Sequence, residues 1–331
     1  NLRNAPERHR SLRAAFDYSW RLLAPASQTV FAQLAVFHGG FDLDAASAVA
    51  GASGQDLAAL AEKSLLTRAP GRYDMHPMLA RFAAEQLAGD PPAHQAAQAR
   101  HAAHYLAFLA GQGDGEEPAQ RQAILAELPN IRAAWQWAAA TRSVHLLLPA
   151  AVTLHNFYSA QSWFREGIDA FTFALAQLPS APEDALLAET RCNLLARQAR
   201  MHIHIGELEE ARRVLDAAHD HLRGMADPAP LATILGYMAI TAYYAGEIEQ
   251  AIDLARRGLA LDEAAGDLNG VGFAHNFLGS CYKARGDYAA AADHFIRSVA
   301  VYAALGDDLG RAMTLNNLGN LAQAQGDFAA A

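Results

Sequence analysis

The hexapeptide GELEEA at residues 206–211 recurs three times at 40-residue intervals, as GEIEQA (246–251), GDYAAA (286–291) and GDFAAA (326–331). An unvarying period of this length is typical of a solenoid built from one repeated supersecondary unit. In each copy the glycine favours the left-handed end of one helix, and the acid after it favours the positive end of the next helix. The sequence therefore predicts a series of helical hairpins.

A small residue lies seven positions before each glycine, where it would let the paired helices touch: Ala199, Ala239, Gly279 and Gly319. With Leu278, Tyr282, Ala291 and Phe295 around it, the third copy resembles the tetratricopeptide (TPR) consensus, in the long form common in bacterial signalling proteins. The resemblance implies that residues 186–331 form a right-handed α-solenoid of about 3.5 repeats. We expect the array to continue past Ala331.

The same resemblance predicts which side chains line the concave face. With Gly286 as position 15 of the TPR pattern, positions 2, 5, 9, 12 and 13 face the groove, and their polar members form the candidate partner site: Asn193, Arg200, His204, Tyr243, Tyr244, Asn276, Lys283, Asn316 and Asn320. These hydrogen-bonding groups suit a protein, an extended peptide or a small-molecule inducer. Alternatively, some of them only solvate an exposed groove.

Residues 1–90 have the pattern of a winged-helix domain. Two amphipathic helices over residues 11–37, broken at Pro25, precede shorter helices at 44–51 and 55–63. A short hairpin around Ala69–Gly71 and a helix at 78–87 complete the set.

Residues 10–87 resemble the winged helix that follows the nucleotide-binding core of STAND (NB-ARC-type) signalling ATPases. Within this stretch, YDMHPML (73–79) is similar to the family's MHD motif, although Pro77 replaces the aspartate. The resemblance implies that His76 contacts the β-phosphate of ADP, held with Mg by a nucleotide-binding domain in cis. The alternative is that His76 only caps the following helix.

Asp90-Pro91-Pro92 is expected to be a linker, because proline disfavours a helix interior. Residues 93–185 then form a helical connector of degenerate repeats. Its NIRAAWQWA stretch (130–138) resembles the helix that opens the superhelical region of bacterial STAND regulators.

Composition narrows the range of partners. The chain has 331 residues, 52% of them hydrophobic, and a net charge of −9, which disfavours nucleic acid as a direct partner. Its two cysteines are far apart in the sequence, as expected for reduced thiols in the cytoplasm, and no apolar run is long enough to span a membrane.

The sequence contains no GxxxxGK[ST], GxSxG or HExxH motif, so we predict no catalytic residue, no metal site and no cofactor within this chain. The whole protein would be a slow ATPase switch that binds ADP or ATP. We expect this chain to be the sensor and autoinhibitory part of a bacterial STAND-type transcriptional regulator, which oligomerises on activation. The alternative is the recognition region of a defence receptor or an interaction scaffold whose effector domain lies elsewhere in the polypeptide.

Overall fold

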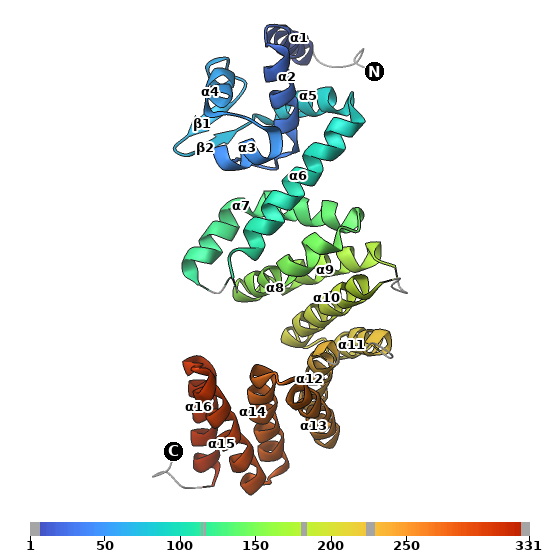
Figure 1. Ribbon diagram of the computed structural model, residues 1–331, viewed down its shortest axis with the longest axis vertical. Helices are drawn as coiled ribbons and strands as arrows, with labels where there is room; N and C mark the ends of the chain where they lie inside the picture. The colour runs from blue at the N-terminus through green and yellow to red at the C-terminus, as the bar shows by residue number, and fades with distance from the viewer. Residues whose placement is uncertain (1–6, 114, 116, 180–183, 223–228, 326–331) are drawn as a thin grey trace. The chain divides into compact units, whose positions relative to one another are not determined.

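The computed structural model (Figure 1) describes residues 7–113, 115, 117–179, 184–222 and 229–325. The chain forms two compact units, Asn1–Gln161 and Ser162–Ala331. Helices dominate both units, and the strands of the described residues form one small two-stranded sheet, so the predicted mostly helical class is confirmed.

The first unit begins with short helices around a hairpin. Its elements in chain order are α1 (Glu7–Arg21), α2 (Pro25–Gln33), η2 (Leu34–Val36), α3 (Leu43–Ala50), α4 (Gly54–Glu62), β1 (Thr67–Ala69), β2 (Arg72–Asp74) and α5 (Pro77–Ala88). The longer helices α6 (Pro91–Ala110), α7 (Pro118–Ala140) and α8 (Val144–Ala160) follow.

Side-chain caps and the hairpin fix this order locally. Asp42 Oδ1 accepts a hydrogen bond from Ala45 N at 2.8 Å and so begins α3. In the sheet, Arg68 pairs with Tyr73, and Phe41 joins the edge through an antiparallel bridge to Tyr73. The turn after η2 is thereby held against β2.

The domain boundary predicted at residues 90–93 differs from the observed division after Gln161. Asp90 caps α6 through Ala93 N at 3.1 Å, and Pro91 and Pro92 occupy the first turn, where proline is tolerated because its missing N–H has no helical partner. Helix α6 then packs against α3 and α5 as well as against α7 and α8. The two prolines therefore start a helix that packs on both sides of the predicted boundary, and they do not form a linker.

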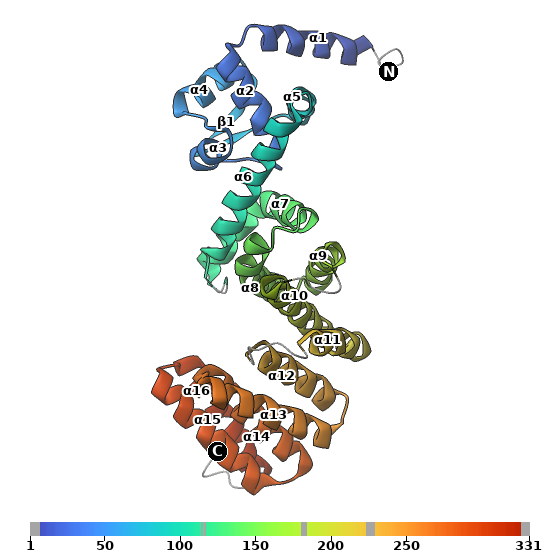
Figure 2. The same cartoon turned by 45° about the vertical axis from the view of Figure 1, so that its right-hand side comes forward.

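The second unit is a succession of helical hairpins (Figure 2). Its helices are α9 (Phe164–Gln177), α10 (Ala185–His204), α11 (Leu208–Leu222), α12 (Ala229–Tyr244), α13 (Ile248–Ala265), α14 (Leu268–Arg285), α15 (Tyr288–Leu305) and α16 (Asp308–Ala324). Each helix packs mainly against its neighbours in sequence. This is the arrangement expected of a repeat protein.

The periodic glycines lie at the helix ends. Gly206, Gly246 and Gly286 have φ angles of 77°, 82° and 87°, which glycine adopts without strain. Gly279 lies where α14 meets α15, and a Cβ there would lie 2.6 Å from the Phe295 ring. The fourth glycine, Gly326, lies outside the described residues.

Both cysteines are buried free thiols. Burial raises the pKa of Cys192 to about 11 and that of Cys281 to about 12, so both stay protonated near neutral pH. In the part of the chain that the structure describes, no helix is long and apolar enough to cross a membrane.

Candidate functional site

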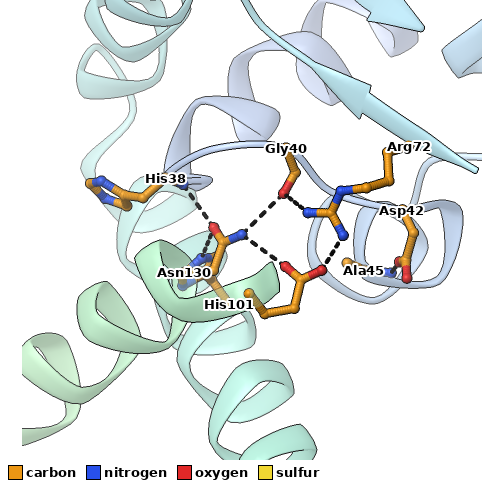
Figure 3. A network of polar contacts seen from close by, with 8 residues as sticks. His38, Gly40, Asp42, Ala45, Arg72, His101 and Asn130 are labelled. Carbon is orange, nitrogen blue, oxygen red and sulfur yellow. Dashed lines mark hydrogen bonds and ion pairs between the residues drawn. The ribbon is translucent and has the colours of Figure 1, made fainter. Parts of the chain in front are cut away.

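A buried polar network joins the turn after η2 to α7 (Figure 3). Asn130, which is 1% exposed, uses all four hydrogen-bonding positions of its amide. Its Oδ1 accepts from His38 N at 2.8 Å and lies 3.3 Å from His101 Nε2. Its Nδ2 donates to the Gly40 carbonyl at 3.1 Å and to Glu127 Oε2 at 3.2 Å. One side chain of α7 thus fixes two backbone groups of the turn.

Arg72 of β2 closes the network from the other side. It donates from Nη2 to the Gly40 carbonyl at 2.7 Å and from Nη1 to Glu127 Oε1. The Glu127 side chain is only 12% exposed, and its carboxylate raises the pKa of Arg72. A Cβ at Gly40 would lie 3.1 Å from the Tyr73 carbonyl, so this approach requires a small residue.

His101 of α6 enters the network as a neutral imidazole. Burial lowers its pKa to about 4, against a smaller opposing effect of the hydrogen bond to Asn130. Because the amide oxygen of Asn130 can only accept, Nε2 of His101 carries the proton in this contact. The sequence pattern includes Asn130 only as part of the NIRAAWQWA helix, because its two backbone partners, His38 and Gly40, lie about 90 residues earlier.

His76, the predicted nucleotide sensor, is exposed at the start of α5. Its Nδ1 accepts a hydrogen bond from Met78 N at 3.3 Å, and Pro77 follows in the first turn. The side chain therefore caps α5 in this structure. Its exposure leaves the ring accessible from outside this chain.

The second unit contains a cavity of about 640 Å³ between the helices of successive repeats. This volume is within the range of small-molecule and peptide-anchor sites. The cavity, called here the repeat groove, is lined by residues of α10, α12, α13 and α14 that include Arg200, His204, Tyr237, Tyr244, Asp262, Phe273 and Phe277.

The lining of the repeat groove contains both basic and acidic side chains. The Arg200 guanidinium lies 5.9 Å from the centre of the Tyr237 ring, as in a cation–π contact. The Asp262 carboxyl has a pKa raised to about 6, chiefly by burial and then by the charge of Asp267. Burial, followed by Arg200, lowers the pKa of His204, so the imidazole is neutral at pH 7.

The groove contains three of the predicted partner residues, Arg200, His204 and Tyr244. The other six lie outside its lining. Asn193 accepts from Arg197 Nε at 2.8 Å, Asn276 accepts from Asn317 Nδ2 at 3.0 Å, and Tyr243 packs edge-on against Phe277. The remaining three are the half-buried Lys283 and the exposed Asn316 and Asn320.

The TPR register nevertheless selects further lining residues. Positions 2, 5, 9, 12 and 13 also include Ile203, Thr233, Gly236, Ile240 and Phe273, all of which line the groove. Ile203, Ile240 and Phe273 are apolar and Gly236 has no side chain, so a choice of hydrogen-bonding side chains leaves them out; the polar Thr233 was omitted as well. Asp262 was missed because it lies on a second helix, α13.

Comparison with known proteins supports the repeat assignment. A family model described as "Tetratricopeptide repeat" matches residues 271–331. The "Putative HTH-type transcriptional regulator Rv0890c" of Mycobacterium tuberculosis is 29% identical over 280 residues. That match covers 77% of this chain but only 31% of the relative, so the chain spans about a third of the length of the curated relative it matches.

Two solved structures match this chain in part. One is the STAND protein PH0952 of Pyrococcus horikoshii, with a tetratricopeptide repeat sensor (TM-score 0.49, 16% identity, 94% of this chain and 49% of that chain). The other is the apo form of RapI (TM-score 0.51, 12% identity, 76% of this chain and 67% of that chain). The family match assigns residues 271–331 to the tetratricopeptide repeat, and the described residues among them, 271–325, form the helices of a helical solenoid.

Proposed function

We propose that this chain is the signal-sensing and autoinhibitory part of a STAND-type transcriptional regulator, and that its inducer binds in the repeat groove. The observation that carries the proposal is the 640 Å³ cavity, in which aromatic side chains and separated charges face the same space. The curated relative, named as a transcriptional regulator, supports the output that we assign to the whole protein.

The first unit supplies the autoinhibitory contact in this proposal. Residues 1–90 act as a winged helix, and His76 reaches the ADP phosphate of a nucleotide-binding domain in cis. The exposed position of His76 at the start of α5 is compatible with that role. The network around Asn130 ties the hairpin to α7, so that the hairpin and α7 move together.

Filling the repeat groove tests the proposal. A Cβ at Gly236 would meet only Phe273 Cε1, at 3.9 Å, so the backbone accepts a side chain there and Gly236→Leu extends into the cavity. Leucine also favours helix over glycine, which keeps α12 intact. Ala264→Leu, at an exposed position of α13 outside the groove lining, is the matched control.

Both variants are made in the intact regulator, and transcription from its target promoter is followed with a reporter across a panel of growth media. We expect Gly236→Leu to abolish the condition-dependent change in output, while Ala264→Leu keeps it. Equal responses of the two variants, with both proteins folded by circular dichroism, would exclude the groove as the sensing site.

A further inference from the structure

We infer that the repeat groove binds an extended peptide, and that a lysine or arginine side chain of this peptide pairs with Asp262 while its apolar side chains lie on the aromatic wall. This inference rests on the proposed function, because it names the class of ligand for the same groove. It depends on three features: an acid without a partner, an aromatic surface, and the continuation of that surface onto the next repeat.

The first feature is Asp262, whose carboxylate faces the groove. Among the residues that the structure describes, no hydrogen bond or ion pair reaches this carboxylate, whereas Asp267 next to it caps α14 through Gly270 N at 3.1 Å. A Cβ at Gly270 would lie 2.5 Å from Asp262 Cγ, so the carboxylate lies directly against the backbone of α14. A half-buried acid of this kind gains most from a cation supplied by a ligand.

The second feature is the aromatic wall of the groove. Phe273 stacks parallel to Phe277 with ring centres 6.4 Å apart, and Phe273 is 44% exposed despite its size. Tyr237 and Tyr244 of α12 line the same cavity. Faces of aromatic rings attract cations and also accept apolar side chains, so the wall suits the stem of a long basic residue.

Arg200 makes the pairing directional. It occupies the Tyr237 face on the α10 side of the groove, whereas Asp262 lies on α13 and Asp267 caps the start of α14. A ligand cation near Arg200 would be repelled, and one near the two acids would be attracted. Charge complementarity thus places the basic group at the acidic end.

The third feature favours a peptide over a compact amine. Met313 of α16 lies 40 residues after Phe273, at the equivalent position of the next repeat, and it is 58% exposed. Leu309, one turn earlier, is 67% exposed. The apolar surface therefore continues along the first helix of the following repeat, over a length that an extended chain can cover.

Binding of defined peptide pools to the whole 331-residue chain tests this inference. The pools are fluorescein-labelled, amidated nonapeptides with alanine, leucine, valine and phenylalanine mixed at eight positions. The central residue is lysine in one pool and norleucine, which has the same stem without the charge, in the other. Butylammonium chloride, used as a competitor, represents a small amine.

We expect fluorescence anisotropy to show about tenfold tighter binding of the lysine pool, the preference typical of a charged hydrogen bond. Asp262→Asn should remove the preference and leave the binding of the norleucine pool unchanged. Asp253→Asn, the same substitution at an exposed position of α13, should retain the preference. Gly236→Leu should abolish the binding of both pools.

Equal affinity for both pools, or a lysine preference that survives Asp262→Asn, would overturn the inference. Failure of both pools to bind would overturn it too, as would displacement of the lysine pool by butylammonium at equal concentration. Each of these results leaves the proposed function standing if Gly236→Leu still blocks the transcriptional response. The proposed function itself is refuted by a different result, an unchanged transcriptional response of the Gly236→Leu variant.

Discussion

Replacement of Asn130 by alanine should unfold the first unit at a markedly lower temperature. The change removes four hydrogen bonds and leaves the N–H of His38 without its acceptor, while the Gly40 carbonyl keeps Arg72. An unpaired buried polar group costs about 1–3 kcal/mol, so we expect a loss of about 3 kcal/mol in the free energy of unfolding. For a unit of this size that loss corresponds to a fall of about 10 °C in Tm.

Tryptophan fluorescence isolates the relevant transition. Trp20, Trp135 and Trp137 belong to the first unit, so a Trp163→Phe background reports the unfolding of that unit alone. Gln122→Ala, at an exposed position of the same helix, should change the stability by less than about 0.5 kcal/mol.

A second variant separates lost hydrogen bonds from lost volume. Asn130→Asp keeps the shape but turns an oxygen toward the Gly40 carbonyl and Glu127 Oε2, so it should be as destabilising as alanine at pH 7. A loss below about 1 kcal/mol for Asn130→Ala, or a harmless Asn130→Asp, would refute our reading of the network.

Three further predictions concern single side chains. Asp262 has a folded-state pKa of about 6, above its ordinary 3.8, so its ionisation opposes folding as the pH rises from 4 to 6. Asp262→Asn should therefore raise the stability of the second unit at pH 7 by about 1 kcal/mol, after allowance for solvent screening. The gain should vanish below pH 4, and urea titrations at both pH values measure the difference. Gly279→Ala should destabilise the second unit by about 1–3 kcal/mol, because the added Cβ meets the Phe295 ring. Gly236→Ala has an open Cβ position and should stabilise the unit by up to about 1 kcal/mol. Losses of equal size in the two variants would contradict the packing argument. His76→Ala should lower the stability of the first unit by no more than about 1 kcal/mol, through the lost helix cap. Calorimetry should detect no binding of Mg-ADP to this chain before or after the change, because its sequence contains no phosphate-binding loop. A micromolar affinity would disprove this expectation.

The repeat architecture follows from the sequence because its determinants are local. A glycine at each helix end and a small residue where paired helices touch lie within one repeat, and Gly286 and Gly279 occupy these positions in the structure. The next glycines, Gly266 and Gly306, also end helices with positive φ, so the turns recur every 20 residues. That shorter period is visible in the sequence from Gly246 onward, and Gly266 and Gly306 mark the second turns of the second and third repeats.

The sites were less predictable for two different reasons. Choosing only polar residues at groove positions omitted Phe273, although the register itself includes that position. The contacts of Asn130 depend on a turn about 90 residues earlier, and no spacing rule connects such distant segments. The prolines at residues 91 and 92 misled because proline both breaks helix interiors and starts helices.

The long sequence separation within the Asn130 network affects how the protein is made. The His38 and Gly40 backbone groups leave the ribosome about 90 residues before the amide that pairs with them, a delay of about 5–20 s at ordinary rates of synthesis. During that interval the turn and the Phe37–Phe41 aromatic stack lack the support of α7. The repeats differ, because each helix meets its neighbour within about 20 residues and can fold as it emerges. The first unit to be translated thus depends on a later segment for completion, and the nascent chain should be most accessible to chaperones and proteases before residue 130 has emerged.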